Sequence, residues 1–556
     1  MKIGTLMASV AVIAMAAAAS AQAAETNNDS KDSNVERPNL VVAQLNTPSG
    51  GSISNAELAA RIQALEDAQT SATDRATADR TRLSTLEQGY NSAVWAFDNG
   101  RPTFASGDGR FTLAIRARVQ ADFAGYSQDS THPAGFAGPS DLSSGSVVRR
   151  AYFGIEGKAY SDFSYELRFN AGGSDGGSFG ASGVPNAGEG DPLLNKAVIS
   201  YTGIPNVHIN VGVLEPAFMM EGTTSSANLM FMERPDFENI AADTFGAGDS
   251  RRGVEVGWAK TDTFWAGDNV TATATFSGGK TGSAQNHGSV ATAGAPGNGD
   301  ENTQVLGRVT DRFWSDGISN FQIGGSFGKV LYSGSNGNAD GGSQSLNLRD
   351  RPEIRVDGTR LIATGGINAK TADMWAVDLE GNFENFYIGG EYAQFSIDRQ
   401  CGAIGAATGC TTSTNVADHP KFYGWAVEGS WILTGETKAY SASALNNEVG
   451  GFQGPIPSRP FSLSGGSWGA WELVARYTDT NLNWNSGQLA IAGTQLAGVL
   501  GGEERIAALG VNWYLNRNIR IMLQDNIVSV SKGTAALPDR DSQDFNVLGL
   551  RFQYAN

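Results

Sequence analysis

Basic side chains recur at alternating positions in the first part of the chain. The set consists of Arg116, Arg118, Arg150, Lys158, Arg168 and Lys196. Guanidinium and ammonium groups along one face could pass an anion in steps, each replacing part of the hydration shell of that anion. Carboxylates share these faces, at Asp122, Glu156 and Glu166. The same cations could therefore be paired, which would leave a polar surface without a strong preference for either sign of charge.

These charges lie in segments whose side chains alternate between apolar and polar. From Phe111 to Phe123 the odd-numbered positions are apolar, and polar residues occupy most of the positions between them. A period of two predicts β-strands with one apolar and one polar face. The alternation returns in residues 150–158, 163–170, 270–276, 423–433 and 548–554. By this parity, the basic set lies on the polar faces.

The connections between the alternating segments are of two lengths. Tight turns are predicted at 160–162, 203–206 and 515–518, and long loops at 127–146, 172–192, 278–302 and 333–350. A soluble sandwich also alternates, but short connections at one end and long ones at the other are typical of an outer-membrane barrel. The length of residues 95–556 suits about sixteen strands, although about fourteen or eighteen would also fit. A barrel of that width encloses an aqueous channel.

The N-terminus predicts export. Lys2, the apolar run 6–19 and the small residues Ala21 and Ala23 indicate a cleaved signal peptide at 1–23. Residues 24–54 are polar and aperiodic, which predicts a disordered linker. Beyond the signal no run of about 18 apolar residues occurs, so no membrane-spanning helix is expected. The net charge of −17 argues against a nucleic-acid partner.

Residues 55–90 carry a different period. Positions separated by alternating steps of four and three form one helical seam, namely Leu58, Ile62, Leu65, Gln69, Ala72, Ala76, Asp79, Leu83 and Leu86. This spacing predicts a short coiled coil in the periplasm. The alternative is a single helix lying against the barrel or the cell wall.

Few residues suit catalysis or metal binding. The two cysteines, Cys401 and Cys410, are expected to form a disulfide that clips an external loop, with two reduced thiols as the alternative. Four scattered histidines give neither metal-ligand spacing nor a nucleophile with its base. We therefore expect no catalytic residue, no cofactor and no metal site.

Four segments carry a family resemblance. They are Val148–Lys158, Val211–Arg234, Arg251–Val254 and Leu509–Asn516, and they resemble segments of the phosphate-selective porin O and P family. The resemblance implies a barrel of about sixteen strands, usually trimeric, whose third external loop folds into the pore. Some members also carry an N-terminal coiled coil. On the segment that resembles this constriction loop, the charged residues are Glu215, Glu221, Glu233 and Arg234.

The expected protein is thus an all-β, transmembrane antiparallel barrel of the bacterial outer membrane, preceded by an α-helical coiled coil. Its expected function is a water-filled channel for passive diffusion of small polar solutes or ions, with anions such as phosphate as one possibility. The expected partners are outer-membrane lipid, lipopolysaccharide, these solutes and two further copies in a homotrimer. The alternative is an outer-membrane adhesin or cell-wall tether with a plugged or narrow barrel, which a conductance measurement would distinguish.

Overall fold

The computed structural model describes most of the chain. The described residues are 54–91, 94–98, 100–128, 142–173, 194–248, 250–280, 302–332, 345–399, 419–441, 450–485, 498–532 and 542–556. The predicted signal peptide at 1–23, nearly all of the predicted linker, and the predicted disulfide partners Cys401 and Cys410 lie outside them. The chain forms two compact units, Met1–Thr85 and Leu86–Asn556, and each is described by itself.

Helix α2 (Asn55–Asn91) begins in the first unit and ends a few residues into the second, and the predicted helix is confirmed. Ser54 caps its N-terminus, because the Ser54 hydroxyl accepts the N–H of Glu57 at 3.3 Å. The seam residues Leu58 and Leu65 are 50% and 70% exposed. In a single chain the predicted coiled-coil seam therefore faces solvent. Among the described residues, no helix combines the length and the apolar character needed to cross a bilayer.

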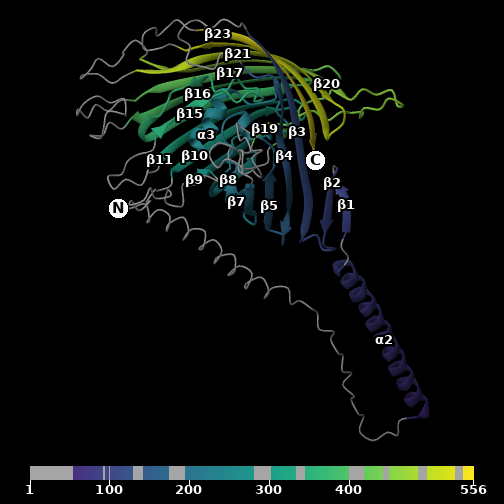
Figure 1. Cartoon of the computed structure of the whole chain (residues 1–556). Coiled ribbons are helices and arrows are strands. Elements are labelled where there is room, and N and C mark those ends of the chain that lie inside the picture. The colour runs from purple at the N-terminus through teal and green to yellow at the C-terminus, as the bar shows by residue number, and fades with distance from the viewer. Residues whose placement is uncertain are drawn as a thin grey trace, which may run out of the picture. The chain divides into compact units, whose positions relative to one another are not determined.

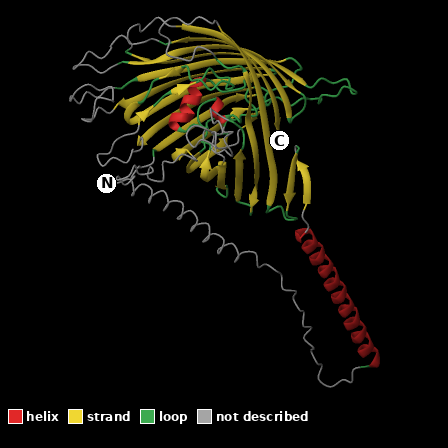
Figure 2. Ribbon diagram, viewed as in Figure 1, coloured by secondary structure: helices red, strands yellow, loops and turns green. Residues whose placement is uncertain are grey.

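Sixteen strands, each antiparallel to its neighbours, close into a barrel in the described part of the chain (Figures 1 and 2). They are β3 (Thr112–Gln128), β4 (Gly145–Ala159), β5 (Phe163–Asn170), β6 (Leu194–Tyr201), β7 (Val207–Leu214), β8 (Arg251–Thr261), β9 (Asn269–Lys280), β10 (Thr303–Ser315), β11 (Asn320–Tyr332), β15 (Ile367–Phe383), β16 (Phe386–Arg399), β17 (Lys421–Ile432), β20 (Ala470–Trp484), β21 (Val499–Tyr514), β22 (Ile519–Ser531) and β23 (Ser542–Ala555). The last strand pairs with the first, with Tyr554 opposite Val119. The predicted fold class is confirmed.

Shorter strands accompany the barrel. They are β1 (Val94–Asp98), β2 (Arg101–Ala105), β12 (Ser345–Leu346), β13 (Arg349–Asp350), β14 (Ile362–Ala363), β18 (Tyr440–Ser441) and β19 (Gly451–Phe452). Strand β1 pairs with β2, and β2 extends the sheet at the beginning of β3, where Thr103 lies opposite Ala114. Both short strands belong to the same sheet as the barrel strands.

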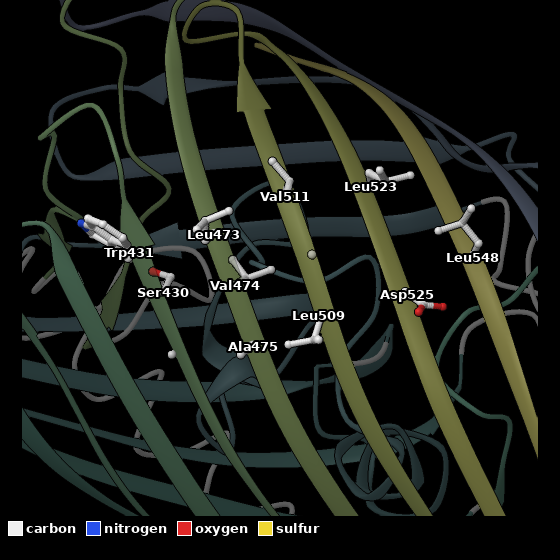
Figure 3. A pocket seen from close by; sticks show the side chains of 12 residues that line it. Ser430, Trp431, Leu473, Val474, Ala475, Leu509, Val511, Leu523, Asp525 and Leu548 are labelled. Atoms are coloured by element: carbon white, nitrogen blue, oxygen red, sulfur yellow. The ribbon is translucent and has the colours of Figure 1, made fainter.

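The alternation predicted from the sequence separates an apolar outside from a polar inside. Outward residues such as Phe153 and Leu509 are each 59% exposed, whereas the inward Gln120 and Arg308 are 0% and 1% exposed. On the outside, a groove of about 560 Å³ runs from β17 across β20, β21 and β22 to β23 (Figure 3). Asp525, in the middle of β22, places a carboxylate among the leucines of this groove.

In the described part of the chain, at least three connections enter the barrel. The described part of the one between β11 and β15, residues 345–366, carries β13 and β14 and is held inside by the ion pair of Glu353 with Arg476 of β20 at 2.7 Å. Residues 215–250, here called the inner segment, join β7 to β8 and contain a 3₁₀ turn, Glu221–Thr223, and helix α3 (Asp236–Phe245). Figure 2 shows α3 surrounded by the strands. Its apolar side packs on the barrel wall, with the ring centroids of Phe245 and Phe395 6.1 Å apart.

One entering connection departs from the predicted pattern of short turns at one end of the barrel and long loops at the other. Residues 433–469 join β17 to β20 at the end of the barrel where the other described connections are tight turns. This segment, here called the lower segment, carries β18 and β19 and is anchored inside, because Lys438 pairs with Glu472 at 2.8 Å. Neither its length nor its composition distinguishes an inward connection from an external loop, so the sequence does not predict it.

Candidate functional site

The barrel places five of the six alternating basic residues in one inner region. Arg118, Arg150, Arg168 and Lys196 are buried at 4–8% exposure, and the Arg116 side chain is 20% exposed. Lys158 is different. It lies near the end of β4, and its side chain is exposed. The basic region is therefore formed by β3, β4, β5 and β6.

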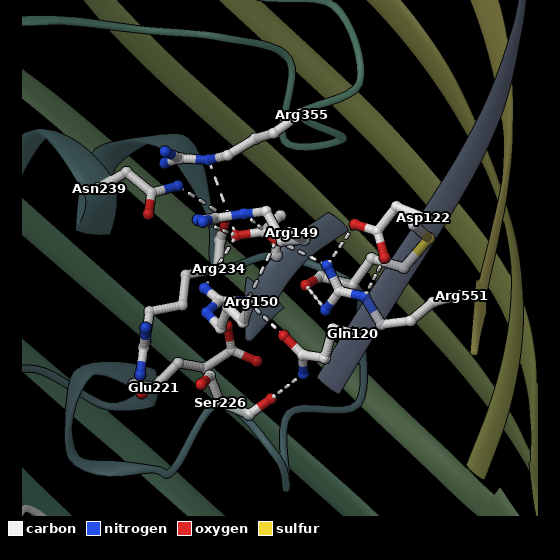
Figure 4. Close-up of polar contacts among 12 residues, drawn as sticks. Gln120, Asp122, Arg149, Arg150, Glu221, Ser226, Arg234, Asn239, Arg355 and Arg551 are labelled. Carbon is white, nitrogen blue, oxygen red and sulfur yellow. Dashed lines mark hydrogen bonds and ion pairs between the residues drawn. The ribbon is translucent and has the colours of Figure 1, made fainter. Parts of the chain in front are cut away.

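In the described part of the chain, four arginines surround the carboxylate of Glu233 on the inner segment, and Figure 4 shows these arginines together. Arg149 donates from Nε and Nη2 at 2.9 and 3.1 Å, and Arg551 of β23 donates at 2.8 Å. Arg150 lies at 3.3 Å and Arg355 at 3.7 Å. Because Glu233 is 2% exposed, this carboxylate fastens the inner segment to β4 and to the last strand, β23, inside the barrel.

Strict alternation predicts the wrong face of the strand for one arginine of this cluster. Arg149 precedes Arg150, so parity puts it on the outer face, yet both side chains are buried inside. The pairing explains the difference, because Gln120 lies opposite Arg150 while Ala121 lies opposite Val148. One extra residue therefore forms a β-bulge that turns two consecutive side chains inward. The Arg-Arg doublet inside an alternating segment is the signal that could have identified it.

A second ionic cluster lies on the same side of the lumen. The Glu166 carboxylate pairs with Lys196 at 2.9 Å, with Arg116 at 3.2 Å and with Arg168 at 3.5 Å. Arg168 also pairs with Glu215, where the inner segment begins. These three cations are therefore largely neutralised by carboxylates, as the mixed-charge interpretation of the sequence required.

Arg118 is held without a carboxylate. Its guanidinium donates to Ser226 Oγ at 2.6 Å and to Ser225 Oγ at 2.8 Å. It also lies over the ring of Tyr152, 5.3 Å from the centroid. Within the described residues, no carboxylate pairs with Arg118, so its positive charge is retained at the inner segment.

Arg234 is held in a similar way. Its Nε donates to the Glu221 carbonyl at 2.8 Å, and its Nη2 donates to the Thr224 carbonyl at 2.7 Å. No acidic side chain of the described chain forms an ion pair with Arg234, and the residue is only half-buried. The turn from Thr224 to Ser226 thus lies between two guanidinium groups that keep their charge.

The opposite wall of the barrel is acidic and covered. Strands β15, β16 and β17 carry inward carboxylates that are 3–4% exposed, namely Asp378, Glu380, Glu391 and Glu428. The inner segment lies over them, since the Met220 N–H donates to Glu391 at 3.0 Å. Glu221 also faces this wall and pairs with Arg476 at 3.2 Å. These carboxylates are therefore less accessible from the lumen than the half-buried Arg116 and Arg234.

The inner segment and the lower segment meet inside the barrel. Asn228 of the inner segment donates to Gln453 of the lower segment. The Tyr440 hydroxyl donates to Gln322 of β11 at 2.9 Å, which fixes the lower segment against the wall below the acidic residues. Because the segments enter from opposite ends, their contact narrows the lumen from both directions.

The described residues contain no group of three or more His, Cys, Asp or Glu side chains arranged to hold a metal ion. His208 lies inside β7, 3.7 Å from Glu255, and the Asn210 amide also donates to that carboxylate at 3.0 Å. This arrangement is a buried polar contact and contains no serine nucleophile.

The model of the family "Phosphate-selective porin O and P" matches residues 113–555. Porin O of Pseudomonas aeruginosa is 23% identical over 438 residues, which cover 75% of this chain and 83% of that protein. Among solved structures, the anion-selective porin from Comamonas acidovorans has 13% identity and a TM-score of 0.40, covering 80% of this chain and all (100%) of that one. The outer membrane channel DcaP of Acinetobacter baumannii has 9% identity and a TM-score of 0.41, covering 80% and 97%.

Proposed function

Since the chain belongs to the phosphate-selective porin O and P family and is a porin channel of the outer membrane, we propose that small anions are its preferred solutes. The proposed path runs along the basic side of the lumen, past Arg116 and Arg168, and crosses the turn between Arg118 and Arg234. Arg150 and Lys196 contribute to the positive potential, and Lys158 lies near the beginning of this path.

One observation carries the proposal. Arg118 and Arg234 are bound by hydroxyl and carbonyl oxygens, so in the described chain no carboxylate cancels their charge. A partly dehydrated anion at this turn would exchange water for guanidinium and hydroxyl donors. The opposing carboxylates are covered by the inner segment, so a cation would find them less accessible in the described part of the lumen.

The second candidate is a general channel for small polar solutes. It is favoured by the pairing of Arg116, Arg168 and Lys196 with Glu166, since paired charges give a mixed field rather than a ring of one sign. The two candidates differ in one measurable quantity, the ratio of anion to cation permeability.

Planar-bilayer recording under a KCl gradient measures this ratio. We expect an anion-selective reversal potential, and a fall of about twofold or more in the permeability ratio for Arg118→Gln and for Arg234→Gln, because each change removes one uncompensated charge. The matched control is Arg505→Gln, whose side chain is 53% exposed and already paired with Glu503. Equal ratios in all four proteins would favour the general channel, and the absence of conductance would favour the adhesin.

We further propose that three copies assemble and that α2 self-associates in the periplasm through its seam. The exposure of Leu58, Ile62 and Leu65 supports this, because a seam of this kind buries its leucines only against another helix. Changing all three residues to Lys should lower the temperature at which trimers dissociate on unheated gels. An unchanged dissociation temperature would support a helix that contacts the cell wall instead. Lipid and lipopolysaccharide are the proposed surroundings of the barrel.

A further inference from the structure

The inner segment meets the acidic wall with carboxyl groups on both sides of the contact. Met220 and Glu221 are neighbours in the chain, and their N–H groups donate to Glu391 Oε1 and to Glu238 Oε1, each at 3.0 Å. The Glu238 carboxyl of α3 therefore lies within hydrogen-bonding reach of the Glu391 carboxyl of β16. The Oε2 atoms of both are buried and accept no hydrogen bond from the described residues.

A second carboxyl pair lies at the beginning of α3. Asp236 Oδ1 accepts the Thr480 hydroxyl at 2.6 Å, and the Glu504 carboxyl of β21 lies within hydrogen-bonding reach of Asp236. Both side chains are 0% exposed. Asp236 Oδ2 and both oxygens of Glu504 have no donor among the residues that the structure describes. Helix α3 is thus attached to the wall at two points, carboxyl against carboxyl.

Two neighbouring carboxyl groups in a buried site repel each other when both are ionised, and a shared proton removes the repulsion. A divalent cation is a poorer explanation, because it requires more oxygen ligands and the described residues contain no group of three suitable side chains. We propose that protons shared by the Glu238–Glu391 and Asp236–Glu504 pairs hold the inner segment on the acidic wall, and that the lumen widens when these protons leave.

The surrounding charges do not replace the protons. The charged groups that face the first pair are Glu221, Glu428, Asp378, Arg234 and Arg308, and those that face the second are Glu353 and Asp350. Acidic groups predominate in both sets. Arg308 is already bound to Asp378 at 2.6 Å, and the nearby Arg476 is bound to Glu353 at 2.7 Å. Neither arginine pairs with a member of the two carboxyl pairs.

The pKa values of two carboxyl groups on α3 give the direction in which pH changes the docking of the inner segment. Burial raises the pKa of the Glu238 carboxyl to about 7, and the nearby Glu221 adds to the rise. Burial also raises the pKa of Asp236 to about 8, despite the hydrogen bond from Thr480. Both pKa values lie above the ordinary 4.5 and 3.8, so the docked segment binds more protons than a released one. Docking is therefore complete at acidic pH and weakens as the pH rises through 7 and 8.

This inference rests on the proposed channel function. Neutral sugars can test it, because the charge of the lumen does not affect their entry. The full-length protein is reconstituted in liposomes, and swelling rates are measured with arabinose and with the larger raffinose at about pH 5 and about pH 9. We expect the ratio of the raffinose rate to the arabinose rate to rise about threefold or more at the higher pH.

A double variant and a control variant test whether the two carboxyl pairs cause the pH response. Glu238→Gln combined with Asp236→Asn keeps the shape of the protonated groups but cannot release a proton, so the ratio should stay low at both pH values. Glu255→Gln is the matched control, since Glu255 is a buried lumen carboxylate that accepts hydrogen bonds from Asn210 and Thr275, and it should keep the wild-type response. A wild-type ratio that does not change with pH overturns the inference, as does a double variant that responds like the wild type. If arabinose causes no swelling at any pH, the channel function fails and the inference fails with it.

Discussion

Replacing Arg551 by Leu is expected to lower the free energy of unfolding by about 3–5 kcal/mol, because it removes one partner from a buried ionic cluster. Arg551 is 0% exposed and binds both oxygens of Asp122 at 2.6 Å. It also donates to Glu233 at 2.8 Å. Leucine would leave two buried carboxylates with fewer donors at the contact between the last strand and the first.

Urea unfolding of the refolded barrel in lipid vesicles, followed by the mobility shift of the folded form on gels, measures this change. Arg505→Leu is the control, because Arg505 is more than half exposed and its loss should change stability by about 0.5 kcal/mol or less. If Arg551→Leu and Arg505→Leu unfold at the same urea concentration, water in the lumen stabilises the carboxylates and the cluster is not a structural lock.

The second large effect is expected at Gly424 of β17. A Cβ at this position would lie 2.3 Å from the Cβ of Phe237 and 2.6 Å from its Cγ. The obstructing atoms adjoin the backbone of α3, so Gly424→Ala must displace the helix rather than rotate a side chain. We expect a loss of about 1–3 kcal/mol from overpacking, together with higher single-channel conductance, because α3 no longer seats on the wall.

Bilayer recordings compare this variant with Gly390→Ala on the neighbouring strand. At Gly390 the nearest atom to an added Cβ is the Ala426 carbonyl oxygen at 3.5 Å, which is ordinary contact. Wild-type conductance in Gly424→Ala would mean that the inner segment absorbs the displacement without opening the path. Raised conductance in both variants would show that the effect does not depend on α3.

The strands were predictable from the sequence because a barrel wall imposes a period of two on every segment that crosses the membrane. The same regularity limits the prediction, since one extra residue reverses the parity. Arg149 is the example, because a bulge turns it toward Glu233. The lower segment was missed for another reason. Parity contains no information about connections, and residues 433–469 enter the lumen only because particular contacts such as Lys438 with Glu472 hold them there.

The ionic contacts of the lumen were less predictable than the faces of the strands. Parity placed Arg118 and Arg168 on the inner side, but it could not show that Arg168 meets Glu215 while Arg118 meets two serines. Those partners are 47 and 108 residues away in sequence, and their positions depend on the path of the inner segment. The charge that remains uncompensated is thus a property of the tertiary structure.

The contacts of the inner segment also constrain the order of assembly. Glu233 lies near the middle of the chain, yet its carboxylate is bound by Arg149 on the second barrel strand and by Arg551 on the last. The segment cannot complete these bonds until the final strand has been synthesised and joined to β3. It must already be enclosed when that seam forms, since a closed wall admits a folded helix only through its mouths. Barrel closure and maturation of the pore are therefore one kinetic event, and a chain stalled before β23 would expose both an open sheet edge and an unsecured lumen.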